Sequence, residues 1–186
     1  MRRISLSVLS ALLLIFSYPP FDIGVFAWFA FLPLFLALQE CSLKKSFGLA
    51  TLTGTLFFLG TLQWIHHVTW PGTLVLVGYL SLYFGLFGIA ARCCPSQWLP
   101  LFLPPAWVVL EWLRSSLFTG FGWPILGYSQ WRFLSLIQVA DLTGAYGVSF
   151  LVMGGNALLY QWVRRRGGRK VLISSVLFVC LFLGVW

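Results

Sequence analysis

Few side chains of this 186-residue chain could take part in chemistry, because only 9% of the residues are charged. Glu111 and Arg114 stand out among them, since both lie inside a long apolar run. An ionisable side chain in such a run is costly in a membrane and usually has a function. The two residues are three positions apart, which fits an ion pair along one face of a helix. Two interpretations remain open: a structural pair that holds this helix to its neighbours, or an Arg114 that meets lipid phosphate or orders the loop after it.

The thiols and imidazoles form no recognisable catalytic or metal-binding set. No C-x-x-C spacing and no neighbouring base occurs at the four cysteines, Cys41, Cys93, Cys94 and Cys180. His66 and His67 are adjacent, so their side chains diverge on a helix, and no nearby carboxylate or cysteine completes a metal site. We therefore predict no catalytic residue, no metal and no cofactor for these residues.

The segment LFTGFGWPILGYSQ, residues 117–130, follows Glu111 and Arg114 and carries no charge. Its three glycines and one proline weaken or break helical hydrogen bonds that lipid cannot replace. We therefore predict an ordered loop at the membrane surface. Gly120 and Gly122 would let the backbone turn sharply, while Trp123 and Tyr128 would offer amphipathic rings at headgroup depth.

The composition predicts a polytopic membrane protein. Hydrophobic residues make up 60% of the chain and the mean hydropathy is +0.92, whereas a soluble domain has about 25% charged residues. This excludes an ordinary soluble domain. The ten tryptophans exceed what packing requires, so we expect several of them to form belts at the membrane interfaces.

The apolar runs predict an all-α bundle of about seven transmembrane helices, at about 20 apolar residues per crossing. The predicted spans are residues 4–18, 23–39, 46–65, 73–91, 98–117, 144–163 and 171–186. Only a PPFD turn separates the first two, which could form a short tilted hairpin. A cleaved signal peptide is disfavoured at the first span because no small-x-small cleavage site follows it.

The basic residues predict the orientation of this bundle. Ten of the twelve fall on one side of the predicted spans: Arg2, Arg3, Lys44, Lys45, Arg92, Arg164, Arg165, Arg166, Arg169 and Lys170. The positive-inside rule places this side, and with it the N-terminus, in the cytoplasm. The net charge of +8 is thus a sign of topology rather than of nucleic-acid binding, and an attraction to anionic headgroups is expected.

Several motifs resemble the membrane region of bacterial apolipoprotein N-acyltransferases. The strongest part is PPAWVVLEWLRSSLFTGFGWPILGYSQ at residues 104–130, followed by IQVADLTGAYGVSFL at residues 137–151 and by Asn156. The YPPFD turn at residues 18–22 resembles the first hairpin of the family. One departure is that Pro124 follows the loop tryptophan, whereas many family members have a proline before it.

The resemblance implies transfer of an acyl chain from a phospholipid to the N-terminal diacylglyceryl-cysteine of an apolipoprotein, at the bacterial inner membrane. In the family, a periplasmic nitrilase-like domain performs the chemistry with a Glu, Lys and Cys triad and a thioester intermediate. No position in this chain matches that triad, so residues 1–186 are expected to be the transmembrane domain, truncated before the nitrilase-like domain. The residues then expected to dock the phospholipid donor and the apolipoprotein acceptor are Glu111, Arg114, Trp123, Tyr128 and Gln130.

Two hypotheses from different classes remain at this point. The first is the membrane part of an N-acyltransferase, as a fragment or as one half of a split enzyme with a separate nitrilase-like partner. The second is a membrane scaffold or lipid-binding protein that kept the fold without catalysis. A transporter is weaker, because no intramembrane carboxylate pair marks an ion path.

Overall fold

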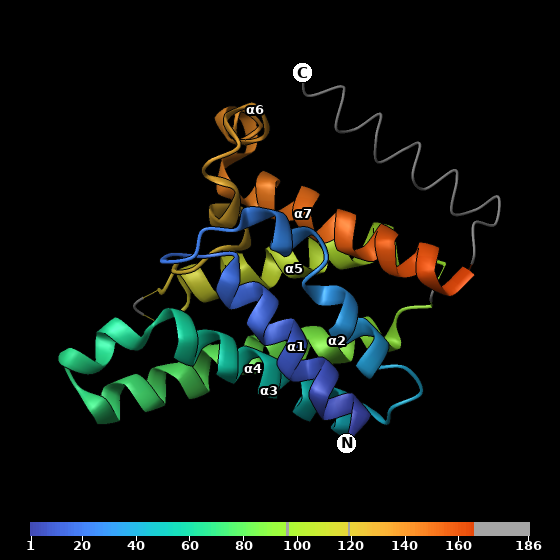
Figure 1. Ribbon diagram of the computed structural model, residues 1–186, viewed down its shortest axis with the longest axis horizontal. Helices are drawn as coiled ribbons and strands as arrows, with labels where there is room; N and C mark the ends of the chain where they lie inside the picture. The colour runs from blue at the N-terminus through green and yellow to red at the C-terminus, as the bar shows by residue number, and fades with distance from the viewer. Residues whose placement is uncertain (96, 119, 166–186) are drawn as a thin grey trace.

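The computed structural model describes residues 1–95, 97–118 and 120–165, and throughout these residues every regular element is a helix (Figure 1). The predicted all-α class is therefore confirmed. In chain order the elements are α1 (Arg2–Phe16), the 3-10 helix η1 (Gly24–Trp28), α2 (Phe31–Ala37), α3 (Leu43–Thr61), the 3-10 helix η2 (Gln63–His67), α4 (Trp70–Cys93), α5 (Leu99–Ser116), the 3-10 helix η3 (Leu126–Gln130), α6 (Leu134–Ile137) and α7 (Ala140–Arg165). The predicted span at residues 171–186 lies outside the described part.

Successive helices run back and forth along the long axis of the molecule (Figure 1). The starts of α1, α3 and α5 and the ends of α2, α4 and α7 therefore lie at one end, here called the basic end. It carries Arg2, Arg3, Lys44, Lys45, Arg92 and Arg164. The opposite end, called the loop end, carries η1, η2, η3 and the loop after α5.

Two of the described helices are long and apolar enough to cross a membrane: α4, and Ala140–Arg164 of α7. Both correspond to predicted spans. The other predicted spans are shorter or less apolar as helices, with α1 at 15 residues and α5 at 18. The count of seven spans and the cytoplasmic N-terminus therefore stay predictions.

The segment 23–39, predicted as one span, is not a continuous helix. It begins as η1, leaves the helical conformation at Phe29 (φ −134°, ψ 7°) and resumes as the short helix α2. The buried backbone groups at this break bind side chains of other helices instead. Asn156 in α7 accepts from the Phe31 N–H (2.9 Å) and donates to the Ala27 carbonyl (2.7 Å), while Ser10 in α1 donates to the Ala30 carbonyl (2.6 Å). An interruption at this depth is tolerated because other helices restore the hydrogen bonds.

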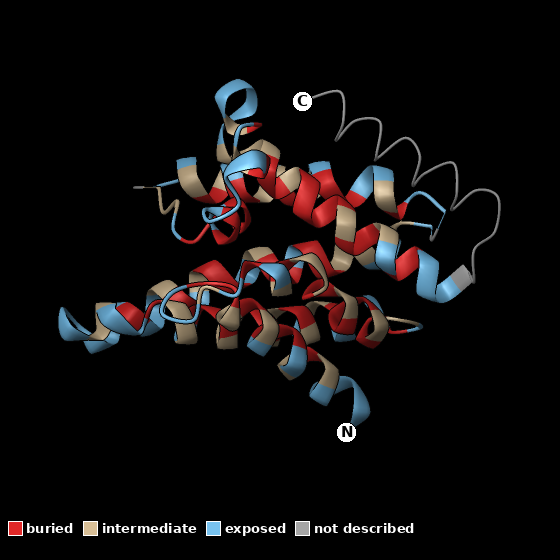
Figure 2. Cartoon of the chain, turned by 45° about the horizontal axis from the view of Figure 1, so that its top comes forward, coloured by how far each residue is buried: buried red, intermediate tan, exposed pale blue. Residues whose placement is uncertain are grey.

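The break brings Phe31 into the centre of the core. Its ring centroid lies 4.8 Å from that of Trp107 in α5, and 6.1 and 5.9 Å from those of Phe84 and Phe87 in α4. Most of these contacts are edge-to-face, which is a favourable geometry for aromatic rings. Figure 2 shows that the buried residues lie mainly where the helices face one another, whereas α6 and the tip of the α3–α4 hairpin are exposed. The core therefore fixes α2, α4 and α5 beneath the loop end.

Most tryptophans lie outside this core. Seven of them expose between 47% and 62% of their surface: Trp64, Trp70, Trp98, Trp112, Trp123, Trp131 and Trp162. Such exposure fits side chains that meet lipid or its headgroups. Their arrangement in belts stays a prediction, because the structure contains no membrane.

Candidate functional site

The segment that follows α5 is an ordered loop, as its glycines and proline predict. The chain leaves α5 at Leu117, and the described residues between it and the start of η3 at Leu126, namely 118 and 120–125, form no helix. Gly120 adopts φ +68°, and a Cβ there would lie 2.3 Å from the Ser115 carbonyl oxygen, so only glycine fits this turn. Gly122 has no positive φ. Of the two glycines predicted to let the backbone turn sharply, Gly120 is therefore the one that does so.

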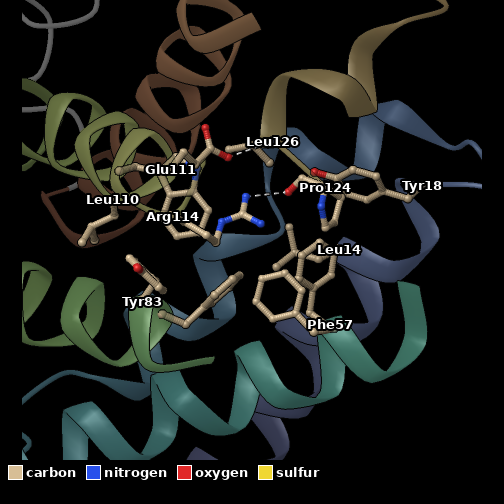
Figure 3. A pocket seen from close by; sticks show the side chains of 12 residues that line it. Leu14, Tyr18, Phe57, Tyr83, Leu110, Glu111, Arg114, Pro124 and Leu126 are labelled. Carbon is tan, nitrogen blue, oxygen red and sulfur yellow. Dashed lines mark hydrogen bonds between the residues drawn. The ribbon is translucent and has the colours of Figure 1, made fainter. Parts of the chain in front are cut away.

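Two side chains bind three successive carbonyls of this loop. Arg114 donates from Nη1 to the Trp123 carbonyl (2.8 Å) and from Nη2 to the Pro124 carbonyl (3.0 Å). The hydroxyl of Tyr18, which follows α1, donates to the Ile125 carbonyl (2.9 Å). Figure 3 shows Arg114 and Tyr18 approaching the loop from different sides.

Two further side chains bind the next two backbone amides. Glu111 Oε1 accepts from the Leu126 N–H (2.6 Å), and Ser149 Oγ in α7 accepts from the Gly127 N–H (2.8 Å). Each residue of the braced segment, Trp123–Gly127, thus has one backbone group held by a side chain. Buried backbone groups need such partners, and here they come from α5, from α7 and from Tyr18 just after α1.

Glu111 and Arg114 do not form the ion pair that their spacing predicts. The ion pair within the described residues is Asp22–Arg132 (3.0 Å), at the loop end. Glu111 and Arg114 are only 2% and 3% exposed and both reach the loop instead. The structure thus agrees with the other interpretation of Arg114, in which it orders the loop after it. The opposite charges still compensate each other within one helical turn.

The space beneath the braced segment is too small for a lipid. The cavity between Tyr18, Glu111 and Arg114 (Figure 3) has a volume of about 10 Å³, which is room for about one water molecule. The Arg114 guanidinium also lies over the Phe58 ring, 5.5 Å from its centroid, which is within the range of a cation–π contact. Glu111 and Arg114 therefore hold the loop from inside the bundle.

Gln130 is also buried and joins two irregular segments. Its side chain is 0% exposed. Nε2 donates to the Gly24 carbonyl (2.8 Å), and Oε1 accepts from the Trp28 indole N–H (3.0 Å). Gln130 thereby ties η3 to η1, so its polar groups point into the protein.

Trp123 and Tyr128 are the two predicted site residues that face outward. They are 47% and 41% exposed, and their ring centroids lie 6.1 Å apart. Two mostly apolar hollows, lined by other residues, lie in the same part of the molecule. One, of about 600 Å³, lies between the start of α4 and the loop and is lined by Val75, Tyr79 and Phe121. The other, of about 550 Å³, lies between η1 and α6.

The sequence did not reveal the roles of Tyr18 and Ser149, although both lie in segments that carry the family resemblance. Each is a hydroxyl in an apolar context, and that alone does not say which backbone group it binds. Asn156 gives a clearer signal, because the only asparagine of the chain stands within a predicted span.

Comparison with known proteins gives one consistent result. The family described as the apolipoprotein N-acyltransferase N-terminal domain matches residues 10–158. The chain is 39% identical to the apolipoprotein N-acyltransferase of Geobacter metallireducens, over 98% of this chain and 37% of that protein. It is 36% identical to the protein of that name from Rhodopirellula baltica, over 84% of this chain and 31% of the relative. It is 32% identical to apolipoprotein N-acyltransferase 1 of Treponema denticola, over 97% and 35%. The chain thus spans about a third of the length of these relatives.

Proposed function

The chain belongs to the apolipoprotein N-acyltransferase family, and we propose that it forms the membrane-embedded part of an enzyme that acylates lipoproteins. The enzyme would transfer an acyl chain from a phospholipid to the N-terminal diacylglyceryl-cysteine of an apolipoprotein. Residues 1–186 would dock both lipid substrates and anchor a nitrilase-like catalytic domain that lies outside them.

The observation that carries this proposal is the exposed pair of Trp123, on the braced segment, and Tyr128, directly after it. Rings on a mobile loop lose conformational freedom when they bind a lipid, and that loss weakens binding. Here the backbone below the rings is already held by Arg114, Glu111 and Tyr18, so less ordering remains to be done. An exposed pair of amphipathic rings suits the glycerol and upper acyl region of a lipid, where one side of the ligand is polar and the other apolar.

The five candidate residues would then have two different roles. Trp123 and Tyr128 would contact the lipid, because they are exposed. Glu111, Arg114 and Gln130 would act as positioning residues, because they are buried and bind the backbone or side chains of neighbouring segments. Their polar groups would set the height and orientation of the two rings.

The proposed location is the bacterial inner membrane, with several spans and the N-terminus in the cytoplasm. The alternating helix directions place Arg2, Arg3, Lys44, Lys45, Arg92 and Arg164 at the basic end, which supports a cytoplasmic side there. The braced segment lies at the opposite end, where a periplasmic catalytic domain could reach the docked lipid.

Complementation tests the proposal. The chain would be expressed alone, and together with a nitrilase-like segment of a relative, in bacteria depleted of their own N-acyltransferase. Mass spectrometry of a lipoprotein would report N-acylation. We expect N-acylation only when the nitrilase-like segment is present, because no position in the sequence matches the Glu, Lys and Cys triad of the family. Absence of N-acylation in both cases, with the chain inserted, would favour a lipid-binding scaffold.

A matched pair of variants tests the docking role within that assay. Trp123→Ala removes an exposed ring from the braced segment, and Trp64→Ala removes a ring of similar exposure from η2 at the same end (47% and 55%). We expect Trp123→Ala to lower the rate of N-acylation by about tenfold, as for a ring whose binding contributes about 1.4 kcal/mol. Equal rates for the two variants would contradict docking at the braced segment.

A further inference from the structure

The basic end contains a polar cavity that the proposed acyltransferase reaction does not use. Its volume is about 250 Å³, and it lies between the loop after α2 and the ends of α4 and α7. The charged and amide side chains that line it are Gln39, Glu40, Arg92 and Arg164. The cavity has room for several water molecules or for one small charged group.

Arg92 is held in place with most of its donors free. Its Nε donates to the Cys41 carbonyl (2.7 Å), and Arg3 donates from Nη1 to the sulfur of the same cysteine (2.8 Å). These bonds fix the loop after α2 and the plane of the Arg92 guanidinium. Neither terminal nitrogen of Arg92 makes a hydrogen bond to any residue that the structure describes. A fork of two free N–H groups fits the paired oxygens of a phosphate.

The other donors at the cavity also lack acceptors. Arg164 makes no hydrogen bond within the described ranges, and Gln39 Nε2 is buried without a partner there. Arg92 and Arg164 are exposed, whereas the Gln39 Nε2 atom is buried. A buried donor that stays unpaired costs free energy, so this group calls for a partner outside the described residues. Donors from α4, from α7 and from the loop after α2 thus line one cavity, and the buried donor among them, Gln39 Nε2, lacks an acceptor.

The chain itself has too few carboxylates to serve as that acceptor. It contains four in total, against twelve basic residues. Asp22 pairs with Arg132 at the loop end, Glu111 binds the braced segment, and Asp141 stands at the start of α7. Only Glu40 remains near the cavity, against Arg92 and Arg164.

Helix dipoles explain part of this arrangement but not all of it. The ends of α2, α4 and α7 carry partial negative charge, which favours basic residues there without any ligand. An arginine near a helix end can in addition bind the terminal carbonyls of that helix. Arg92 instead binds the Cys41 carbonyl through Nε alone, and Arg164 binds no carbonyl in the described part of the chain.

We propose that this cavity binds a phosphate group, carried by an anionic phospholipid headgroup or by a soluble phosphate ester. Arg92 would bind two phosphate oxygens, Arg164 would bind a third, and Gln39 would donate from Nε2. The site is independent of the acyltransferase proposal, because it lies at the end opposite the braced segment.

Native mass spectrometry of the full chain in detergent tests the site. The probes are dioctanoyl phosphatidylglycerol, dioctanoyl glycerol, which has the same acyl chains without phosphate, and glycerol 3-phosphate. We expect phosphatidylglycerol to bind about tenfold or more tightly than dioctanoyl glycerol, as for charge-assisted hydrogen bonds. Displacement of phosphatidylglycerol by equimolar glycerol 3-phosphate would identify a soluble ester as the ligand, and its failure would identify a lipid. Equal binding of the two dioctanoyl lipids would overturn the proposal.

Three variants and a control locate the ligand. Arg164→Gln and Arg92→Gln should each weaken binding of phosphatidylglycerol by about tenfold. Arg164 forms no bond within the described fold, so its variant tests the site even where Arg92→Gln disturbs folding. Glu40→Gln should strengthen binding by several-fold, because it removes the one nearby negative charge. Arg2→Gln, an equal change of charge outside the cavity, should leave binding unchanged. Equal binding by Arg164→Gln and Arg2→Gln would overturn the proposal.

Discussion

Two irregular segments lie at the loop end, and they differ in how their backbone is held. The braced segment, Trp123–Gly127, binds side chains that come from α1, α5 and α7 or follow them. In η2 no residue is buried, and its side-chain hydrogen bond joins the His66 ring to the nearby Gln63 carbonyl. Both segments carry exposed aromatic rings, with Trp64 55% exposed in η2.

The difference teaches that composition alone does not identify a prepared binding surface. Aromatic residues near a helix end are common to both segments, and only the braced segment has buried polar partners beneath it. Those partners include the charges of Glu111 and Arg114, whose burial is costly unless each finds hydrogen bonds. In return for this cost, the loop gains a fixed geometry. For this reason we propose that Trp123 and Tyr128, rather than η2, dock the lipid.

Arg114→Met is expected to reduce the difference between the braced segment and η2 the most. It removes the donors to the Trp123 and Pro124 carbonyls and leaves the Glu111 carboxylate buried without an opposite charge. Removal of one partner of a buried charge pair costs about 3–5 kcal/mol. We expect a loss of that size in the free energy of unfolding, measured by titration with dodecyl sulfate in mixed micelles.

The double variant Arg114→Met, Glu111→Gln separates the effect of the uncompensated buried charge from the effect of the changed side-chain shape. Neutralising Glu111 in the Arg114→Met background removes the uncompensated charge, so the double variant should recover part of the lost stability. Strictly additive losses in the free energy of unfolding would mean that the two charges do not interact. Proteolysis within residues 117–125 should also become faster in Arg114→Met, since the loop would then resemble η2.

The next largest effect is expected from Gly127→Ala. A Cβ at this position would lie 2.3 Å from the Ala145 carbonyl oxygen, so the braced segment would have to move away from α7. Overpacking of this kind costs about 1–3 kcal/mol. Gly122→Ala is the matched control in the same loop, because its Cβ would meet only the Ser115 side chain, at 3.3 Å or more. Equal unfolding free energies for the two variants would contradict close packing of the loop on α7.

The sequence predicted correctly those features that depend on the residues of one segment alone. The apolar runs predicted an all-α fold, and the glycines and proline predicted a loop after α5, because both signals are local. The prediction failed at residues 23–39, whose apolar run gives no sign of the break. The break depends on Asn156, which lies 125 positions away from Phe31. Likewise, the spacing of Glu111 and Arg114 predicted a pair, whereas tertiary packing offered each of them a backbone partner in the loop.

A smaller effect is expected from Tyr18→Phe, which removes one of the side-chain hydrogen bonds that hold the braced segment. The ring stays packed against Phe57 (centroids 5.3 Å apart), and only the hydrogen bond from the hydroxyl to the Ile125 carbonyl is lost. One such bond contributes about 1 kcal/mol. The same titration should therefore detect a loss between those of Gly127→Ala and the η2 variants. No measurable loss would mean that water replaces the hydroxyl at the Ile125 carbonyl.

The smallest effect is expected in η2 itself, from His66→Ala and His67→Ala. Neither imidazole is buried, and the His66 ring contacts the neighbouring His67 and Trp70 rings and the Gln63 carbonyl. Exposed substitutions of this kind usually change the free energy of unfolding by no more than about 0.5 kcal/mol. We also expect N-acylation in the complementation assay to stay unchanged, because η2 holds no part of the braced segment. A loss of activity without a loss of stability would place a functional contact at η2 and make the two segments parts of one surface.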